Sequence, residues 1–247
     1  GLGLPAATYA KLVMRISAVW MSINGIFNSH LMLALAIEKF GTEAQKRQWL
    51  PKLASGEIRG GLALTEPDAG TDLQGIRMTA RREGEHYVVN GTKTWITNGA
   101  EGSCVGLLVK TNPDADPRHK GMSLFIAPKG PGFTVGRKLE KLGYKSIDSG
   151  ELIFQDYRIP ADHLIGEVEG RGFTQVAGGL ELGRINVAAR GVGIAEGEAD
   201  RHPRRQPDGA GHGGERAGEL LAVAGAGPVE EEGGDGVEVL APLDVER

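Results

Sequence analysis

The sequence contains a single cysteine, Cys104, so it cannot form an internal disulfide. The neighbours Val105, Leu107 and Leu108 are apolar, which predicts a buried thiol within a β-strand and fits a reducing compartment. Basic residues are not in excess: 28 Lys and Arg stand against 32 Asp and Glu, for a formal net charge of -4. This balance gives no electrostatic footprint for nucleic acid or for an anionic membrane surface.

The sequence also lacks features of targeting and membrane insertion. No apolar run approaches the length expected of a membrane span, and the first residues lack the charged region of a signal peptide. The chain begins with Gly1 rather than Met, so we expect that its start is not the authentic N-terminus. With 40% hydrophobic and 24% charged residues, it has enough material for the core of a soluble globular protein whose partners are small molecules or other subunits.

Residues 6–53 carry apolar side chains at helical spacing, which predicts helices, and Gly41 is expected to end the first of them. Thr42 and Gln45 predict a capping box that opens a second helix, and Pro51 is expected to kink or end it. No second metal ligand stands at suitable spacing from His30, so a core histidine is expected and no metal site is predicted. The apolar stripe of the first helix is Ile23, Ile26, Phe27, His30, Leu31, Ala34 and Ile37.

From Gly60 the apolar period changes from helical to alternating, which predicts strands. Asn90-Gly91, between two such runs, is typical of a two-residue hairpin turn. Short strands separated by Gly, Pro and Asp clusters favour a small barrel or two packed sheets. The predicted strands cover residues 61–64, 78–81, 86–89, 92–97, 105–110, 122–126 and 152–154.

A second helical period follows residue 164, on a face made of Phe173, Val176, Ala177, Leu180, Arg184, Val187 and Ala188. From residue 196, Gly, Glu, Arg and Pro dominate and the amphipathic period is lost. The predicted fold class is therefore α+β: a helical region at 1–57, a middle β-barrel-like domain at 58–163, the start of a helical bundle at 164–195 and a low-complexity tail at 196–247.

Two short stretches carry the chemistry. After an apolar run, Thr65, Glu66, Pro67 and the Gly70-Thr71 pair bring amides and hydroxyls together at a turn, which is a cradle for an anion. In the second stretch, Trp95 and Thr97 point to one face at strand spacing, so a flat ring system could pack on the indole and hydrogen-bond to the threonine. Either stretch alone could equally be purely structural, as an ordinary turn or a core tryptophan. That explanation is much weaker when both stretches occur together in one β domain.

Together, Leu64-Thr65-Glu66, Gly70-Thr71-Asp72 and Trp95-Ile96-Thr97 resemble the flavin-facing motifs of the acyl-CoA dehydrogenase family. The resemblance runs from Gly1 to about Ala195 and implies an FAD-dependent oxidoreductase that dehydrogenates an acyl-CoA thioester between Cα and Cβ, as in fatty acid β-oxidation. It assigns FAD contacts to Leu62, Leu64, Thr65, Gly70, Thr71, Trp95, Ile96 and Thr97. Thr65 would bind the pyrimidine edge, Gly70 and Thr71 the pyrophosphate, and Thr97 would lie near flavin N5.

The same resemblance assigns substrate contacts to Thr71, Glu181 and Arg184, although Glu181 and Arg184 could equally pair with each other on one helix face. The catalytic base stays unassigned. In most members of the family this glutamate lies in the C-terminal bundle, and in a minority it directly precedes the residue that matches Arg184, where this chain has Gly183. The abrupt loss of resemblance near residue 195 suggests a shifted reading frame or an assembly error, with a natural low-complexity tail as the alternative.

The resemblance further implies an electron-transfer flavoprotein as electron acceptor and a homo-oligomer, although the bundle segment that holds the neighbour's FAD is not found. It also implies a location in the bacterial cytoplasm or the mitochondrial matrix. Because the base is not found, this chain is expected to be an incomplete, inactive version of the enzyme. Two alternatives stay open: a flavin monooxygenase of the same architecture, and a non-catalytic module that binds acyl-CoA or a protein.

Overall fold

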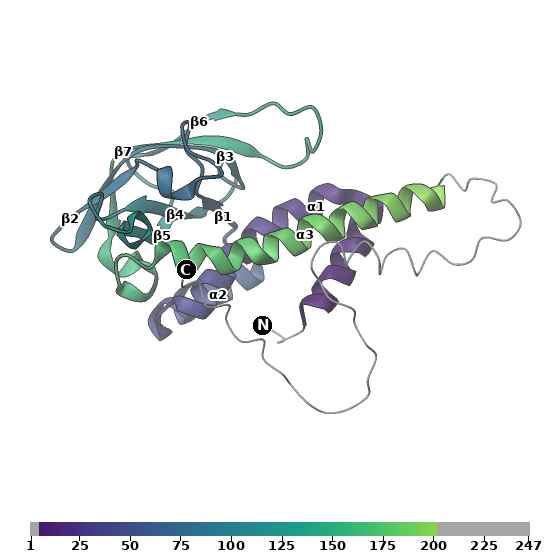
Figure 1. The fold of residues 1–247 in the computed structure, drawn as a ribbon, viewed down its shortest axis with the longest axis horizontal. Helices are drawn as coiled ribbons and strands as arrows, with labels where there is room; N and C mark the ends of the chain where they lie inside the picture. Colours follow the sequence, from purple (N-terminus) through teal and green to yellow (C-terminus); the bar gives the residue numbers. More distant parts are fainter. Residues whose placement is uncertain (1–4, 202–247) are drawn as a thin grey trace, which may run out of the picture. The chain divides into compact units, whose positions relative to one another are not determined.

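The structure, a computed structural model, describes residues 5–201, so the predicted tail at 196–247 lies outside the described residues from residue 202 onward. The described part is α+β, as the sequence predicts (Figure 1). Its helices are α1 (Ala6–Phe40), α2 (Glu43–Ser55) and α3 (Gly172–Arg201). Its strands are β1 (Gly60–Ala63), β2 (Thr79–Glu83), β3 (His86–Thr97), β4 (Cys104–Lys110), β5 (Met122–Pro128), β6 (Phe133–Lys138) and β7 (Ser149–Pro160).

Local signals set the ends of the first two helices. Gly41 caps the end of α1, and the predicted capping box is present: the Gln45 amide donates to the Thr42 hydroxyl while the Thr42 amide donates to the Gln45 side chain. Pro51 is expected to kink or end α2, and it does not end it, because the helix continues through it to Ser55. Burial of Trp49 and Leu53 on one face outweighs the loss of one backbone donor at the proline.

α1 and α3 lie side by side over most of their lengths (Figure 1). A Cβ added to Gly193 would lie 2.2 Å from the Met14 carbonyl oxygen, and one added to Gly197 would lie 2.4 Å from that of Ala18. Only glycine allows so close an approach of two backbones. α3 therefore runs on beyond Ala195 to Arg201, and small residues rather than large apolar ones make this contact.

Both predicted helix stripes are correct only in part. On α1, Ile37 is fully buried, but Ile23 and Leu31 are exposed, and α1 is broken by non-helical backbone at Trp20. On α3, Val176 is buried, whereas Ala177, Arg184 and Val187 are exposed. The buried face of α3 carries polar and small residues instead: Gly172, Gln175, Gly179, Asn186 and Ala189. Hydrogen bonds from side-chain amides, such as Asn186 Nδ2 to the Tyr9 hydroxyl at 2.8 Å, link this face to the rest of the protein, and an apolar period cannot reveal them.

The seven strands form one mixed sheet in the order β1-β4-β2-β3-β7-β6, with β5 paired to the other side of β4. The sheet curls around an apolar core that includes Tyr87, Phe125, Phe154 and Ile159 (Figure 1). β1 pairs with β4 in parallel, and β3 pairs with β7 antiparallel along most of its length. Cys104 begins β4 and is buried, and burial raises the pKa of its thiol to about 12.

The hairpin prediction at Asn90-Gly91 is wrong. Both residues lie inside the continuous strand β3, at a register shift between Val89 and Gly91, and the turn of the β2–β3 hairpin lies at Gly84 and Glu85. Gly91 has φ 139°, so the glycine serves a β-bulge rather than a turn. The sequence analysis also missed β6, whose side chains beyond Phe133 are largely exposed.

The loop between β6 and β7 is fastened to the helices by Tyr144. A Cβ on Gly25 of α1 would lie 1.9 Å from the Tyr144 hydroxyl oxygen, so the absence of a side chain at residue 25 makes room for the ring. From α3, Arg190 hydrogen-bonds this hydroxyl and its guanidinium lies 5.1 Å from the ring centroid. One aromatic side chain thus joins the sheet to both long helices.

α1 is long and apolar enough, by length and composition alone, to cross a membrane, in contrast to the expectation from the sequence. Core helices of soluble proteins pass the same test. In this structure α1 buries Val13, Leu33, Ala36 and Ile37 within the protein. We therefore interpret α1 as a core helix, although part of its surface is exposed.

Candidate flavin site

The two predicted flavin-facing stretches lie next to each other. The amide of Thr94 in β3 donates a hydrogen bond to the carbonyl oxygen of Thr65, 2.9 Å away, just beyond the end of β1. At the start of β1, a Cβ on Gly61 would lie 2.2 Å from the carbonyl oxygen of Thr97. The segment 61–65 therefore runs against the second half of β3, although the two strands do not pair along their lengths.

The first stretch offers unused hydrogen-bond donors. Within the described part of the chain, the backbone N–H groups of Thr65, Gly70 and Thr71 donate no hydrogen bond. The Thr65 hydroxyl has no hydrogen-bond partner there either. Thr65 is partly buried, whereas Gly70 and Thr71 are exposed. Donors clustered in this way suit an anionic or carbonyl-bearing ligand.

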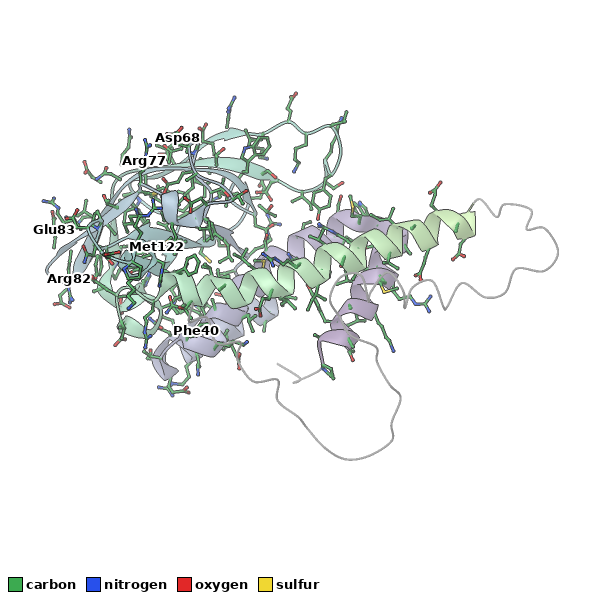
Figure 2. All side chains as sticks on the ribbon, viewed as in Figure 1. Phe40, Asp68, Arg77, Arg82, Glu83 and Met122 are labelled. Carbon is green, nitrogen blue, oxygen red and sulfur yellow. The ribbon has the colours of Figure 1, made fainter. Side chains whose placement is uncertain are left out.

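The turn between these donors is closed by its own backbone. Glu66 and Ala69 exchange two backbone hydrogen bonds, of 2.8 and 3.2 Å, which leaves Pro67 and Asp68 at an exposed tip. The Asp68 carboxylate lies 3.7 Å from the guanidinium of Arg77 on the surface (Figure 2). An exposed ion pair of this kind contributes little to stability, so the turn is stabilised mainly by contacts with buried residues.

The interior contact is an ion pair between Glu66 and Lys93, two residues whose partnership the sequence analysis missed. The Lys93 ammonium donates to Glu66 Oε1 at 2.9 Å and to the carbonyl oxygen of Leu64 at 2.8 Å. Lys93 is fully buried and the Glu66 side chain is 8% exposed. Glu66 also accepts hydrogen bonds from the amides of Arg77, at 2.7 Å, and Met78, at 3.1 Å.

The electrostatics of this pair follow from its burial. Desolvation lowers the pKa of Lys93 to about 8, and the Glu66 carboxylate opposes this shift. A lysine in a strand is usually a surface residue. The partner of Lys93 becomes visible only in the folded structure, where the Leu64-Thr65-Glu66 motif lies beside β3. No local pattern around Lys93 predicted a buried charge.

Trp95 is presented outward by an irregular backbone. It has φ 59°, in the left-handed region, within a second register shift between Lys93 and Ile96. Its side chain is 58% exposed, while Ile96 next to it is 2% exposed and belongs to the core. Thr97 is partly buried and its hydroxyl has no partner among the described residues. The predicted arrangement, with Trp95 and Thr97 away from the core and Ile96 toward it, is consistent with this burial pattern.

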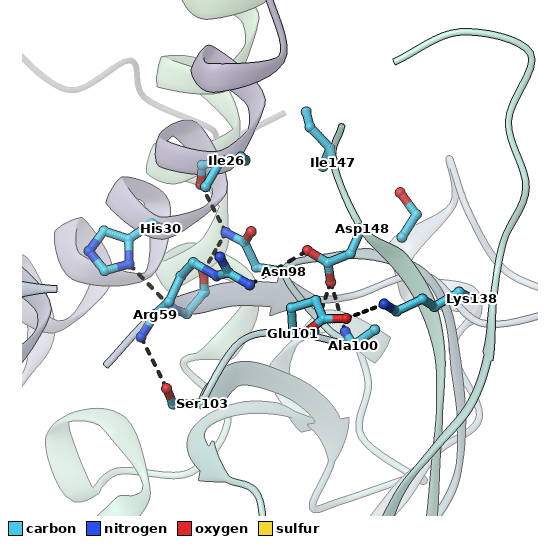
Figure 3. Close-up of polar contacts among 12 residues, drawn as sticks. Ile26, His30, Arg59, Asn98, Ala100, Glu101, Ser103, Lys138, Ile147 and Asp148 are labelled. Carbon is cyan, nitrogen blue, oxygen red and sulfur yellow. Dashed lines mark hydrogen bonds and ion pairs between the residues drawn. The ribbon is translucent and has the colours of Figure 1, made fainter. Parts of the chain in front are cut away.

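The chain beyond Thr97 is held by two side chains that the sequence analysis did not single out (Figure 3). Asn98, with φ 60°, donates from Nδ2 to the carbonyl oxygens of Ile26 in α1, at 2.8 Å, and Gly60, at 2.9 Å. Asp148 accepts hydrogen bonds from the amides of Ala100, at 2.9 Å, and Glu101, at 3.1 Å. The end of the second stretch is thereby fixed to α1, β1 and the β6–β7 loop.

His30 belongs to the same joint and is partly buried there, rather than being the core histidine that the sequence predicts. Its Nε2 lies 3.0 Å from the carbonyl oxygen of Leu53, and its Nδ1 accepts from the amide of Gly60 at 3.2 Å (Figure 3). Both ring nitrogens are therefore engaged by backbone groups. The ring links α1, α2 and the start of β1.

A cavity of about 550 Å³ opens beside this joint. Its lining includes Ser149, which is the register partner of Thr97 in β7. Two of the lysines that line it already interact with other side chains: Lys138 forms an ion pair with Glu101, and Lys141 donates a hydrogen bond to Ser149 Oγ at 2.8 Å. The full lining is Ile26, Arg59, Glu101, Lys138, Leu139, Glu140, Lys141, Lys145, Ser146, Ile147, Asp148 and Ser149.

Glu181 and Arg184 are both exposed on α3 and do not form an ion pair with each other in the described part of the chain. The structural alternative for these residues, a mutual link on the helix, is therefore not observed. Gly183 precedes Arg184 on the side of Met32, and a Cβ there would make ordinary contact, 3.6 Å from the Met32 sulfur.

Comparison with known proteins places this geometry in context. Residues 1–57 match the family model of the acyl-CoA dehydrogenase N-terminal domain, and residues 61–157 match that of the acyl-CoA dehydrogenase middle domain. A short-chain specific acyl-CoA dehydrogenase of Clostridium acetobutylicum is 40% identical over 199 residues, which is 80% of this chain and 52% of the relative. The chain spans about half the length of the curated relatives it matches.

Solved structures agree. A chain in a structure of the electron transferring flavoprotein of Acidaminococcus fermentans superimposes with a TM-score of 0.77 and 38% identity, covering 83% of this chain and 55% of that one. A structure of PigA with FAD and proline gives a TM-score of 0.78 at 27% identity, covering 91% of this chain and 59% of that one. By two family models, its relatives and its fold, this chain belongs to the acyl-CoA dehydrogenase family.

Proposed function

We propose that the chain carries the FAD-binding part of a dehydrogenase that forms a double bond between Cα and Cβ of an acyl-CoA thioester. The observation that carries this proposal is the hydrogen bond from Thr94 to Thr65, which brings the unused donors of one stretch beside the exposed Trp95 of the other. The N–H groups of Gly70 and Thr71 are exposed, and the left-handed backbone at Trp95 turns its indole outward, so these groups are available to a ligand. Both features fit a flat, partly anionic cofactor.

In this proposal the residues divide the cofactor between them. Thr65 binds the pyrimidine edge with its N–H and hydroxyl, and Leu62 and Leu64 supply apolar contact beside it. Gly70 and Thr71 offer amides to the pyrophosphate, where a side chain at residue 70 would narrow the approach. Trp95, Ile96 and Thr97 line the ring system.

The bound flavin would supply the hydride acceptor, and the chain's own residues would orient the substrate against it. Thr71, Glu181 and Arg184 are the proposed substrate contacts, and the exposed state of Glu181 and Arg184 leaves them available for this role. We assign no catalytic base within the described residues. The division into a helical region to residue 57, a β domain to residue 163 and a bundle helix beyond it belongs to the same proposal.

The partners follow from the family. An electron-transfer flavoprotein is the proposed electron acceptor, and the likeness to a chain in the Acidaminococcus fermentans structure supports it. A homo-oligomer is proposed on the same basis. The bacterial cytoplasm and the mitochondrial matrix are both consistent with the relatives, whose names include mitochondrial enzymes and enzymes of bacteria.

The test is an FAD titration of the purified 247-residue chain, followed by addition of a short-chain acyl-CoA. We expect one FAD per chain and a perturbed flavin absorption spectrum when the acyl-CoA binds. The Thr65→Val variant, which removes only the hydroxyl, should weaken FAD binding by about two- to tenfold. The matched control Thr79→Val, at an exposed position on β2, should leave it unchanged. Binding of acyl-CoA without uptake of FAD would overturn the proposal in favour of a non-catalytic module.

A further inference from the structure

The buried ion pair between Lys93 and Glu66 lies between the two proposed flavin-facing stretches without belonging to either contact surface. Glu66 follows Thr65 directly, and Lys93 stands two residues before Trp95. Lys93 reaches from β3 into the first stretch, where it bonds both Glu66 Oε1 and the carbonyl oxygen of Leu64. Its ammonium therefore bonds the residues on both sides of Thr65.

Glu66 has further hydrogen-bond partners besides Lys93. Glu66 accepts from the amides of Arg77 and Met78, so the carboxylate ties the turn to the approach to β2. Every oxygen of Glu66 has a donor, and two of the three protons of Lys93 have acceptors. Among the described residues, one backbone hydrogen bond crosses the same gap directly, from the Thr94 amide to the Thr65 carbonyl oxygen.

Such a pair is a poor way to gain stability. Removing two charges from water costs several kilocalories per mole per ion, and apolar residues of similar size often replace a buried pair without loss. A buried pair with several hydrogen bonds instead fixes a unique geometry, because neither group can move without leaving a charge unpaired. Because the pair lies between the two flavin-facing stretches, the geometry that it fixes is the spacing between them.

We propose that Lys93 and Glu66 are positioning residues that hold the Leu64–Glu66 segment against β3 and so set the spacing between Thr65 and Trp95 for flavin binding. This inference rests on the proposed function for its link to FAD. The other part of the inference, that the ion pair fixes the spacing of the two stretches, does not depend on any ligand.

Three variants of the full chain separate positioning from plain stability. Lys93→Met removes the ammonium and leaves Glu66 buried without its counter-ion, so both stability and FAD affinity should fall. Adding Glu66→Gln removes the orphaned charge while keeping an oxygen for the Arg77 and Met78 amides, so stability should recover. The Leu64 bond stays lost, so FAD affinity should remain about tenfold below that of the parent chain. Val109→Ala, in the core of β4, serves as a destabilised control and should change FAD affinity less than about twofold.

The ligand-independent readout is amide hydrogen exchange at Thr94, compared with amides of β4 and β5. In the double variant we expect Thr94 to lose protection by about tenfold while β4 and β5 keep theirs. Recovery of stability together with FAD affinity and Thr94 protection would overturn the proposal, as would equal affinity losses in Val109→Ala. If the parent chain binds no FAD, the proposed function fails, and exchange at Thr94 still decides whether the pair fixes the spacing. If Lys93→Met alone does not fold, the double variant, which leaves neither charge unpaired, carries the test by itself.

Discussion

The backbone of Gly61 lies against the carbonyl of Thr97 so closely that a Cβ on Gly61 would come within 2.2 Å of that oxygen. The β1 segment and the end of β3 therefore meet backbone to backbone, with no side chain between them. This contact, the Thr94–Thr65 hydrogen bond and the Lys93–Glu66 ion pair all join the segment at residues 61–66 to the second half of β3. We expect the proposed flavin site to need all three contacts.

Replacing Trp95 with alanine should weaken FAD binding without lowering stability. The side chain is 58% exposed, so its removal takes away little of the folded core. Aromatic packing on a ring system is worth about 1 kcal/mol beyond area burial, which corresponds to about a fivefold rise in Kd. Trp20→Ala is the matched control, because Trp20 is 54% exposed and lies on α1. Equal FAD affinity in the two variants, measured by titration, would argue against the contact.

Replacing Gly91 with alanine should destabilise the β domain by about 1 to 3 kcal/mol. The residue has φ 139° and a Cβ would lie 2.8 Å from Cγ of the buried Met78, so conformation and space both oppose a side chain. Gly84→Ala separates the two effects, since Gly84 has φ 60° but nothing within 4 Å of the added Cβ. Urea unfolding measures both. A smaller loss at residue 91 than at residue 84 would contradict the steric explanation.

Replacing Gln45 with leucine should cost about 2 to 4 kcal/mol of unfolding free energy. The Gln45 side chain is buried and bonds four backbone groups: the Thr42 and Gly166 amides and the Asp162 and Leu164 carbonyls. Leucine of similar size leaves all four without this partner. Thr42→Ala removes only the cap bond and should cost about 1 kcal/mol. Thermal or urea unfolding of the two variants would show whether Gln45 acts beyond its capping box.

The buried state of Lys93 predicts a specific pH dependence. Its pKa is about 8 in the folded chain against 10.5 for the free side chain, so between these values the unfolded chain binds more protons. The free energy of unfolding contributed by this group therefore rises with pH in that window. Burial raises the pKa values of Cys104 and Tyr87 to about 12, which acts in the opposite direction above pH 9.

The measurement is therefore a difference. Unfolding free energies of the parent chain and of the Lys93→Met, Glu66→Gln double variant are compared at pH 7.5 to 9.5. The parent should gain stability relative to the variant as the pH rises. A difference that stays constant over this range would show that Lys93 titrates normally.

The 247-residue chain loaded with FAD should show no rapid bleaching by saturated acyl-CoAs, because no base is assigned in its described part. Gly183→Glu introduces a carboxylate directly before Arg184, and the added Cβ makes only ordinary contact with Met32, at 3.6 Å. A general base contributes about 10² to 10⁴-fold in rate, so this variant should bleach faster by a measurable factor. Gly183→Gln, which has the same shape without the charge, is the control. Rapid bleaching of the parent would reveal a base that we have not found.

The sequence alone determined those features that depend on neighbours along the chain. Gly41 and the Thr42–Gln45 capping box set two helix ends, and alternating runs gave β4 and β5 nearly to the residue. The motifs around Thr65 and Trp95 indicated the family, which the comparisons confirmed. These signals are local, because caps, strand periods and motifs are written within a few residues.

Only the tertiary structure decided the features that require two distant segments at once. Asn90-Gly91 suits either a turn or a bulge, since both use a glycine with positive φ, and the pairing of β3 with β7 selects the bulge. Lys93 looks like a surface residue until Glu66 and Leu64 enclose it. The buried face of α3 could not be read from apolar period, because glycine approach and hydrogen bonds, rather than large apolar side chains, hold it against α1.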